Sequence, residues 1–162
     1  MLNSPVFEVT LLNKYTVELP YTIVKPFVEQ KLNRIKVKAT FEDRATEFHA
    51  ALIKEKSGTY RMYFSNAKQK ELGVFMNDHF NLQLFEDISK YGVDLSEELE
   101  AVLLSDYEGY TIFESLTPGK QRSMIYAIQR YKSSQTRVDK ALLLMENLKR
   151  GIKDPKLWLK SN

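Results

Sequence analysis

The spacing of hydrophobic residues changes once along the chain. Before residue 88, several short segments alternate apolar and polar positions, as strands with one buried face do. The clearest is 34–41, where Ile35, Val37 and Ala39 share a face. From residue 94 onward the apolar positions recur every three or four residues, which predicts helices. The pattern therefore predicts an α+β fold with its strands first.

The first half of the chain predicts five or six strands, with short helices after the second and the fifth. The predicted strand segments are 6–19 (one strand, or two joined by a hairpin at Asn13-Lys14), 34–41, 45–56, 59–64 and 79–87. Several short strands at this spacing favour a small β-barrel over an open parallel sheet. No glycine-rich phosphate loop follows a strand, which argues against a nucleotide-binding α/β fold.

The second half predicts four helices with recognisable ends. Asp94, Asp106, Thr117 and Thr136 are the expected N-caps, and Pro118 stands at a first helical position. Gly151 is expected to end the last helix. We expect a β-barrel domain over 5–88, a helical unit over 94–151, and a tail over 152–162. The tail is expected to be mobile unless Trp158 and Leu159 dock on the domain.

The net charge of +3 conceals an asymmetry. From Thr117 onward the chain has eleven Lys and Arg residues against three Asp and Glu residues, a net charge of +8. The preceding residues carry a net charge of −5. The basic character therefore belongs to the C-terminal third, and any anionic partner is expected there.

The composition limits the cellular compartments and the kinds of catalytic or metal site that the protein can have. The chain has no cysteine, which excludes disulfides, thiolate zinc sites and cysteine nucleophiles, and which fits a cytoplasmic protein. The N-terminal residues do not form a signal-peptide pattern. No apolar run approaches the ~18 residues needed to span a bilayer.

The segment from Phe113 to Gly151 resembles the YdeI/OmpD-associated family, also called bacteriocin-protection proteins. The matching residues are a Phe and Leu before a Pro-Gly turn, a basic helix, a Lys that ends it, and a Thr-Arg pair opening the next helix. They are Phe113, Leu116, Pro118-Gly119, Arg122, Tyr126, Ile128, Lys132, Thr136-Arg137 and Gly151. The chain departs from the family where Tyr131 replaces a small residue and Lys140-Ala141 replaces a basic-Ile pair.

The first half resembles the β-rich domain of unknown function that commonly precedes this segment. Together the two resemblances imply a small closed or double-split β-barrel followed by a four-helix unit. They also imply a bacterial protein with a phenotype of tolerance to antimicrobial peptides. They imply no established enzyme activity, cofactor or metal.

Candidate catalytic groups are few. His49 and His79 lie near Glu47 and Asp78, so a metal site or an acid–base pair is one interpretation and a structural or exposed role is the other. The carboxylates Glu97, Glu98 and Glu100 form either a solvated helix flank or a proton-sharing pair. A further group of aromatic residues either packs a core or lines a cavity for an apolar ligand. These are Tyr60, Tyr63, Phe64, Phe75, Phe80 and Phe85. In each case the structural interpretation is preferred, and no catalytic residue is assigned.

The last two helices carry the strongest functional signal. Three alternatives fit their cations: a solvated basic face, a surface for nucleic acid or another polyanion, or a surface for a protein or membrane partner. The predicted partner-binding residues are Arg122, Arg130, Lys132, Arg137 and Lys140. We expect a non-enzymatic protein that binds a partner here, with nucleic-acid binding or a ligand in the barrel as alternatives.

Overall fold

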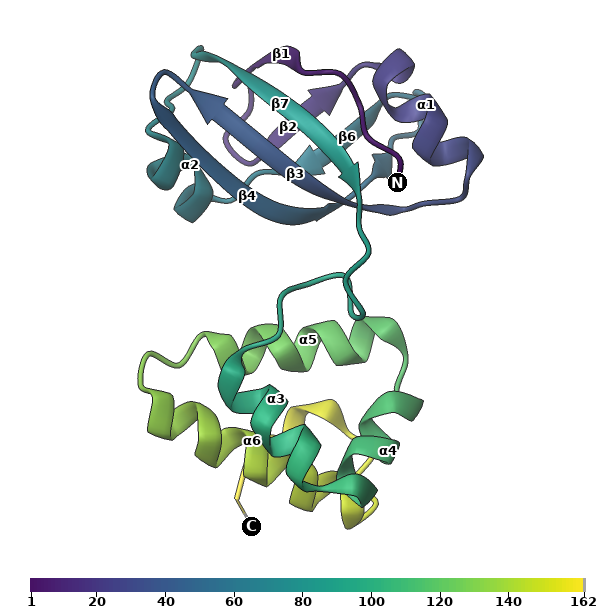
Figure 1. The fold of residues 1–162 in the computed structure, drawn as a ribbon, viewed down its shortest axis with the longest axis vertical. Helices are drawn as coiled ribbons and strands as arrows, with labels where there is room; N and C mark the ends of the chain where they lie inside the picture. Colours follow the sequence, from purple (N-terminus) through teal and green to yellow (C-terminus); the bar gives the residue numbers. More distant parts are fainter. Residues whose placement is uncertain (162) are drawn as a thin grey trace. The chain divides into compact units, whose positions relative to one another are not determined.

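The computed structural model describes residues 1–161 and divides into two compact units, residues 1–88 and the residues from 89 onward. The first is rich in strands and the second is helical (Figure 1). The predicted α+β fold and its C-terminal helical unit are therefore confirmed.

The β unit consists of two antiparallel sheets. One has the strand order β1-β7-β3-β4 and the other β2-β6-β5. The strands are β1 (Phe7–Thr10), β2 (Thr16–Leu19), β3 (Arg34–Phe41), β4 (Arg44–Ala51), β5 (Ile53–Lys54), β6 (Tyr60–Tyr63) and β7 (His79–Glu86). Within residues 1–161 no ladder joins the two sheets, so the predicted closed barrel is not formed.

The chain changes sheets at two points where continuity was predicted. No hairpin forms at Asn13-Lys14, because β1 pairs with β7 and β2 pairs with β6. The predicted strand 45–56 is divided after Ala51: β4 pairs with β3, and β5 pairs with β6. Leu52, between them, donates its amide to the Asn33 carbonyl. Alternation alone does not reveal such transfers, because both strands still direct apolar residues into one core.

That core lies between the two sheets and is filled by aromatic and branched side chains. Phe64 is fully buried and lies 5.4 Å, centroid to centroid, from both Phe48 and Phe80. Helix α1 (Tyr21–Glu29) adds Val24 and Phe27, each without exposed area. Helix α2 (Asn66–Leu72) adds Leu72.

The helical unit contains α3 (Glu97–Ser105), α4 (Tyr107–Ser115), α5 (Pro118–Gln129), α6 (Ser134–Lys149) and a final 3₁₀ turn, η1 (Pro155–Leu157). Its core is separate from that of the β unit and draws residues from every one of these helices. Met124, Ile125 and Ile128 of α5 are buried. On α6, Leu144 is fully buried, whereas Leu142 is half exposed.

Two caps lie two or three residues from their predicted positions. Ser96, rather than Asp94, accepts the amide of Leu99 at the start of α3. Ser133, rather than Thr136, caps α6, which therefore begins at Ser134. In each case a serine directly before the first helical residue supplies the side-chain acceptor. Thr117 and Gly151 are confirmed at the start of α5 and the end of α6.

The segment after Gly151 docks on the helical unit. Trp158 is 2% exposed, and its indole N–H donates to the Ile152 carbonyl at 2.6 Å. Leu159 also packs against this core. Asn147, itself buried, donates its side-chain amide to the carbonyls of Leu157, Trp158 and Lys160. Of the two predicted alternatives for the tail, docking is the one observed.

Candidate functional site

The acidic and basic segments of the helical unit contact each other. Residues 89–116 contain seven Asp and Glu residues and a single Lys, and they precede the segment of charge +8. Two ion pairs join the segments: Arg137 to Glu98 at 3.4 Å and Lys149 to Asp106 at 2.7 Å. Because the −6 of the acidic segment is added to the +8 of the basic one, the described part of the unit has a net charge of only +2.

The carboxylate of Asp106 makes one contact with α4 and one with α6. Its carboxylate caps α4 by accepting the amide of Gly109, and it also accepts from the Lys149 ammonium. The hydrogen bond from Lys149, followed by the one from Gly109, lowers the pKa of Asp106. The same contact raises the pKa of Lys149. These charges thus hold α4 against the end of α6.

Two of the predicted partner-binding residues make internal contacts around Tyr131. Arg137 donates from Nε to the Tyr131 carbonyl at 2.7 Å, in addition to pairing with Glu98. Lys140 lies with Nζ 5.5 Å from the Tyr131 ring centroid and donates to the Leu159 carbonyl. These contacts fix the turn between α5 and α6.

The other three predicted residues lie along one helix and its C-terminal turn. Arg122 is half-buried, Arg130 and Lys132 are exposed, and Tyr126 between them is 41% exposed. Residues spaced by four share a helix face, so Arg122, Tyr126 and Arg130 form a line about 12 Å long. We call Arg122, Tyr126, Arg130 and Lys132 together the α5 basic face. No acidic residue occurs from Leu116 to Val138, and no ion pair is recorded for these three cations in the described chain.

The histidines have carboxylate partners other than the nearest ones in sequence. His49 Nδ1 lies 2.8 Å from Asp87 Oδ2, and both side chains are buried. His79 is exposed and contacts Thr10 at 2.9 Å and Glu8 at 3.6 Å. Asp78 instead accepts the amide of Phe75. Among residues 1–161 no group of three or more His, Cys, Asp and Glu side chains is placed to hold a metal ion.

In both the acidic cluster and the aromatic group, some residues are exposed and others make contacts inside the protein. Glu97 and Glu100 face solvent, whereas Glu98 reaches α6. Its own backbone amide, and then Ser134 and Arg137, lower the pKa of Glu98 although partial burial opposes this. Of the aromatic residues, Tyr60, Phe64 and Phe80 are buried in the core, Phe85 is half-buried, and Tyr63 and Phe75 are exposed.

A polar network at the start of the helical unit was not predicted. The hydroxyl of Tyr91 donates to Glu114 at 2.5 Å, and Lys90 lies 3.1 Å from the same carboxylate and 2.6 Å from the Tyr110 hydroxyl. Burial, followed by the bond to Glu114, raises the pKa of Tyr91. Burial acts to raise the pKa of Glu114, but the bonds from Tyr91 and Lys90 outweigh it and lower that pKa. Lys90 and Tyr91 contact residues that lie 20 and 23 positions later in the chain, so spacing gave no signal for this network.

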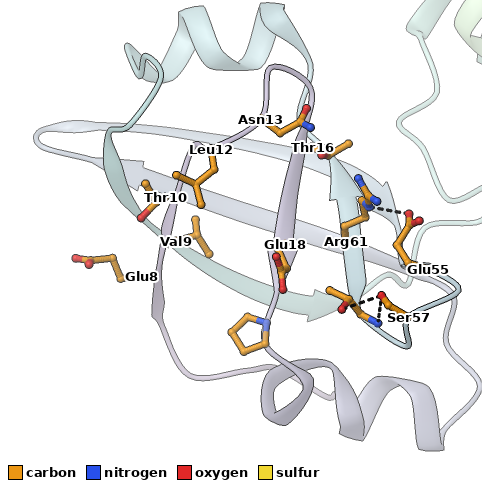
Figure 2. Close-up of a pocket in the computed structure, with 12 residues that line it drawn as sticks. Glu8, Val9, Thr10, Leu12, Asn13, Thr16, Glu18, Glu55, Ser57 and Arg61 are labelled. Atoms are coloured by element: carbon orange, nitrogen blue, oxygen red, sulfur yellow. Dashed lines mark hydrogen bonds and ion pairs between the residues drawn. The ribbon is translucent and has the colours of Figure 1, made fainter.

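The β unit has a groove that the sequence did not indicate. It has a volume of about 550 Å³ and lies beside the facing edges of β1 and β2 (Figure 2). Its lining includes residues of both strands and, along one flank, residues near the β5–β6 turn. They are Glu8, Val9, Thr10, Leu12, Asn13, Thr16, Glu18, Pro20, Glu55, Ser57, Thr59 and Arg61. We call it the edge groove.

Comparison with known proteins identifies the helical segment. Residues 93–151 match the family described as Bacteriocin-protection, YdeI or OmpD-Associated, which confirms the resemblance. A solved structure, the solution structure of PHS018 from Pyrococcus horikoshii, aligns with 53% of this chain and 94% of its own. Its sequence identity is 13% and its TM-score 0.43. The search of curated proteins gives no match. Within residues 1–161, no helix is both long enough and apolar enough to cross a membrane.

Proposed function

We propose that this chain is a non-enzymatic bacterial protein that contributes to bacteriocin tolerance by binding an acidic surface of another protein. The α5 basic face would be the contact site. The observation that carries the proposal is that its three cations have no carboxylate partner among residues 1–161, within a segment matched by the bacteriocin-protection family.

The composition of this face favours a protein partner. Arg and Tyr are enriched among the residues that dominate the binding energy of protein interfaces. Here two arginines flank an exposed tyrosine on one helix. Arg137 and Lys140 would support the surface indirectly, because their contacts with Tyr131 and Leu159 hold the turn that carries Lys132.

The proposal includes two further statements: the protein has no catalytic activity, and it is located in the cytoplasm. The buried pairing of His49 with Asp87 supports a structural role for that histidine. The absence of cysteine supports a reducing compartment. Cell fractionation tests the location directly.

A complementation experiment tests the surface. A strain lacking the gene is expected to become more sensitive to a cationic bacteriocin, and wild-type protein to restore tolerance. The variant Arg122→Ala/Arg130→Ala/Lys132→Ala is expected to fail. The matched control Lys25→Ala/Lys54→Ala/Lys70→Ala removes three exposed cations from the β unit and is expected to succeed. Unchanged sensitivity of the deletion strain would contradict the phenotype, and full rescue by the first variant would contradict the surface.

Nucleic-acid binding is the second candidate, because the same cations could contact phosphates. Three phosphate contacts would reduce affinity by roughly fortyfold between 50 and 200 mM salt. Mobility-shift titrations with duplex DNA and single-stranded RNA measure this. A complex with that salt dependence, abolished by the triple variant, would replace the protein partner with a nucleic acid.

A further inference from the structure

The edge groove lies beside two strands that each have one open edge. β1 and β2 each stand at the end of their sheet, and within residues 1–161 no ladder joins them. An open strand edge presents unpaired amides and carbonyls that can pair with another extended chain. The groove is therefore a place where backbone, as well as side chains, is available for binding.

Strand register shows which backbone groups face the groove. Leu11 donates to the Asp78 carbonyl, continuing the register in which Val9 pairs with Phe80. Hydrogen-bonded pairs alternate along an antiparallel ladder, so Val9 bonds toward β7 while Glu8 and Thr10 direct their backbone groups the other way. The carbonyl of Thr10 accepts the amide of Leu12. The amide of Thr10 and both backbone groups of Glu8 have no hydrogen-bond partner among the described residues.

The same reasoning applies to β2. Phe64 donates to the Tyr15 carbonyl, which continues the register in which Val17 pairs with Met62. Thr16 and Glu18 therefore direct their backbone groups away from β6. All four outward-directed residues, Glu8, Thr10, Thr16 and Glu18, line the groove. The open backbone and the hollow surface thus coincide.

The charged side chains of the groove are mainly acidic. Its three glutamates outnumber its single cation, Arg61, and Arg61 pairs with Glu55 at 2.6 Å (Figure 2). Glu8 and Glu18 therefore remain as an acidic excess beside the open edges, with His79 3.6 Å from Glu8. Val9, Leu12 and Pro20 supply apolar surface between the polar residues.

We propose that the edge groove binds an extended peptide segment with alternating basic and apolar residues by strand addition to β1 or β2. Each strand has four residues, so the pairing segment would be about 13 Å long. Backbone pairing supplies affinity in this mode, and side chains at alternate positions supply specificity. Lysine or arginine side chains would face Glu8 and Glu18. This site is in the β unit and does not depend on the α5 basic face.

The test uses the full chain and a defined probe, the blocked peptide Lys-Val-Lys-Val-Lys-Val labelled with a fluorophore. We expect saturable binding by fluorescence anisotropy. The same peptide with every backbone amide N-methylated keeps its charge but has no amide left to donate along either edge, and we expect it not to bind. The peptide Glu-Val-Glu-Val-Glu-Val is also expected not to bind.

Variants locate the site. Glu8→Gln/Glu18→Gln should weaken binding by about tenfold, since each exposed ion pair changes an equilibrium by up to roughly fivefold. The matched control Glu29→Gln/Glu47→Gln removes two exposed carboxylates elsewhere in the β unit and should leave affinity unchanged. Slowed hydrogen exchange at the amides of Glu8, Thr16 and Glu18 should accompany binding.

Three results would overturn the proposal. Absence of binding to the lysine peptide would show that the glutamates only protect the edges from pairing. Equal binding of the N-methylated peptide would show charge attraction without strand addition. Equal affinity in both double variants would place the peptide elsewhere. The triple α5 variant is expected to bind the probe normally, so this site and the proposed function fail or succeed separately.

Discussion

The two units distribute charge in different ways. In residues 1–88, twelve Lys and Arg residues and eleven Asp and Glu residues are interspersed. In the helical unit an acidic segment precedes a basic one, and the fold brings them together through Glu98–Arg137 and Asp106–Lys149. Charge segregated along a chain is therefore a poor guide to surface charge when the two segments pack together. The cations of the α5 basic face are among those of the described basic segment that form no ion pair.

The largest expected effect tests whether the units are separate. Trp158→Ala removes a buried indole from the core of the helical unit and is expected to destabilise that unit by about 3–5 kcal/mol. Because the β unit has its own core, we expect two unfolding transitions, of which only the helical one moves. Near- and far-ultraviolet circular dichroism during urea titration measures both. Leu157→Ala, at a half-exposed neighbour, is the control, and a coincident shift of both transitions would contradict separate units.

A smaller effect tests how the tail is attached. Asn147→Ala leaves the carbonyls of Leu157, Trp158 and Lys160 without their shared donor, and is expected to cost about 1–3 kcal/mol. Hydrogen exchange near Trp158 should accelerate, and its fluorescence should shift to the red. The exposed residue Gln135, whose side-chain amide donates to Asp139, offers the control Gln135→Ala. Unchanged fluorescence in Asn147→Ala would show that Trp158 docks without this amide.

The smallest effect tests the charge pairing itself. Asp106→Ala removes a helix cap and should cost about 1 kcal/mol, whereas Asp106→Asn keeps a capping oxygen and loses the negative charge. The pKa of Asp106 is lowered from 3.8 in the folded protein, so its carboxylate stabilises the fold above about pH 4. This contribution is lost as the pH falls through the lowered pKa.

The stability difference between wild type and Asp106→Asn should therefore be present at pH 6 and vanish at the acidic end of a pH series. Urea titrations at each pH provide the measurement. A difference that is constant with pH would show that Asp106 acts only as a cap.

Local patterns predicted the elements well and their partners less well. The alternation in 34–41 and the Thr117-Pro118 start are determined by neighbouring residues, and the structure reproduces both. The transfer of the chain between sheets at residues 11–15 and at Leu52 depends on which strands become neighbours, and residue spacing carries no such information. The edge groove is a product of these transfers and was missed for that reason.

The candidate site shows the same division. Sequence reasoning identified the cations of the last two helices, and the family match covers them. It did not distinguish Arg137 and Lys140, which contact Tyr131 and Leu159, from Arg122, Arg130 and Lys132. That distinction depends on distances between residues of different elements. It also depends on the acidic residues of α3 and α4, which lie well before the basic segment in sequence.

The docked tail has a consequence for where this unit can be cut. The family match ends at Gly151, whereas the hydrophobic core continues to Trp158. A recombinant fragment ending at the match would lack the indole and would expose the apolar side chains that surround it. Such a fragment is expected to aggregate or to fold loosely, while one extending through Lys160 keeps all three carbonyls that Asn147 binds. For this segment, the boundary of recognisable similarity lies seven residues before Trp158 and nine before Lys160, where the folded unit is expected to end.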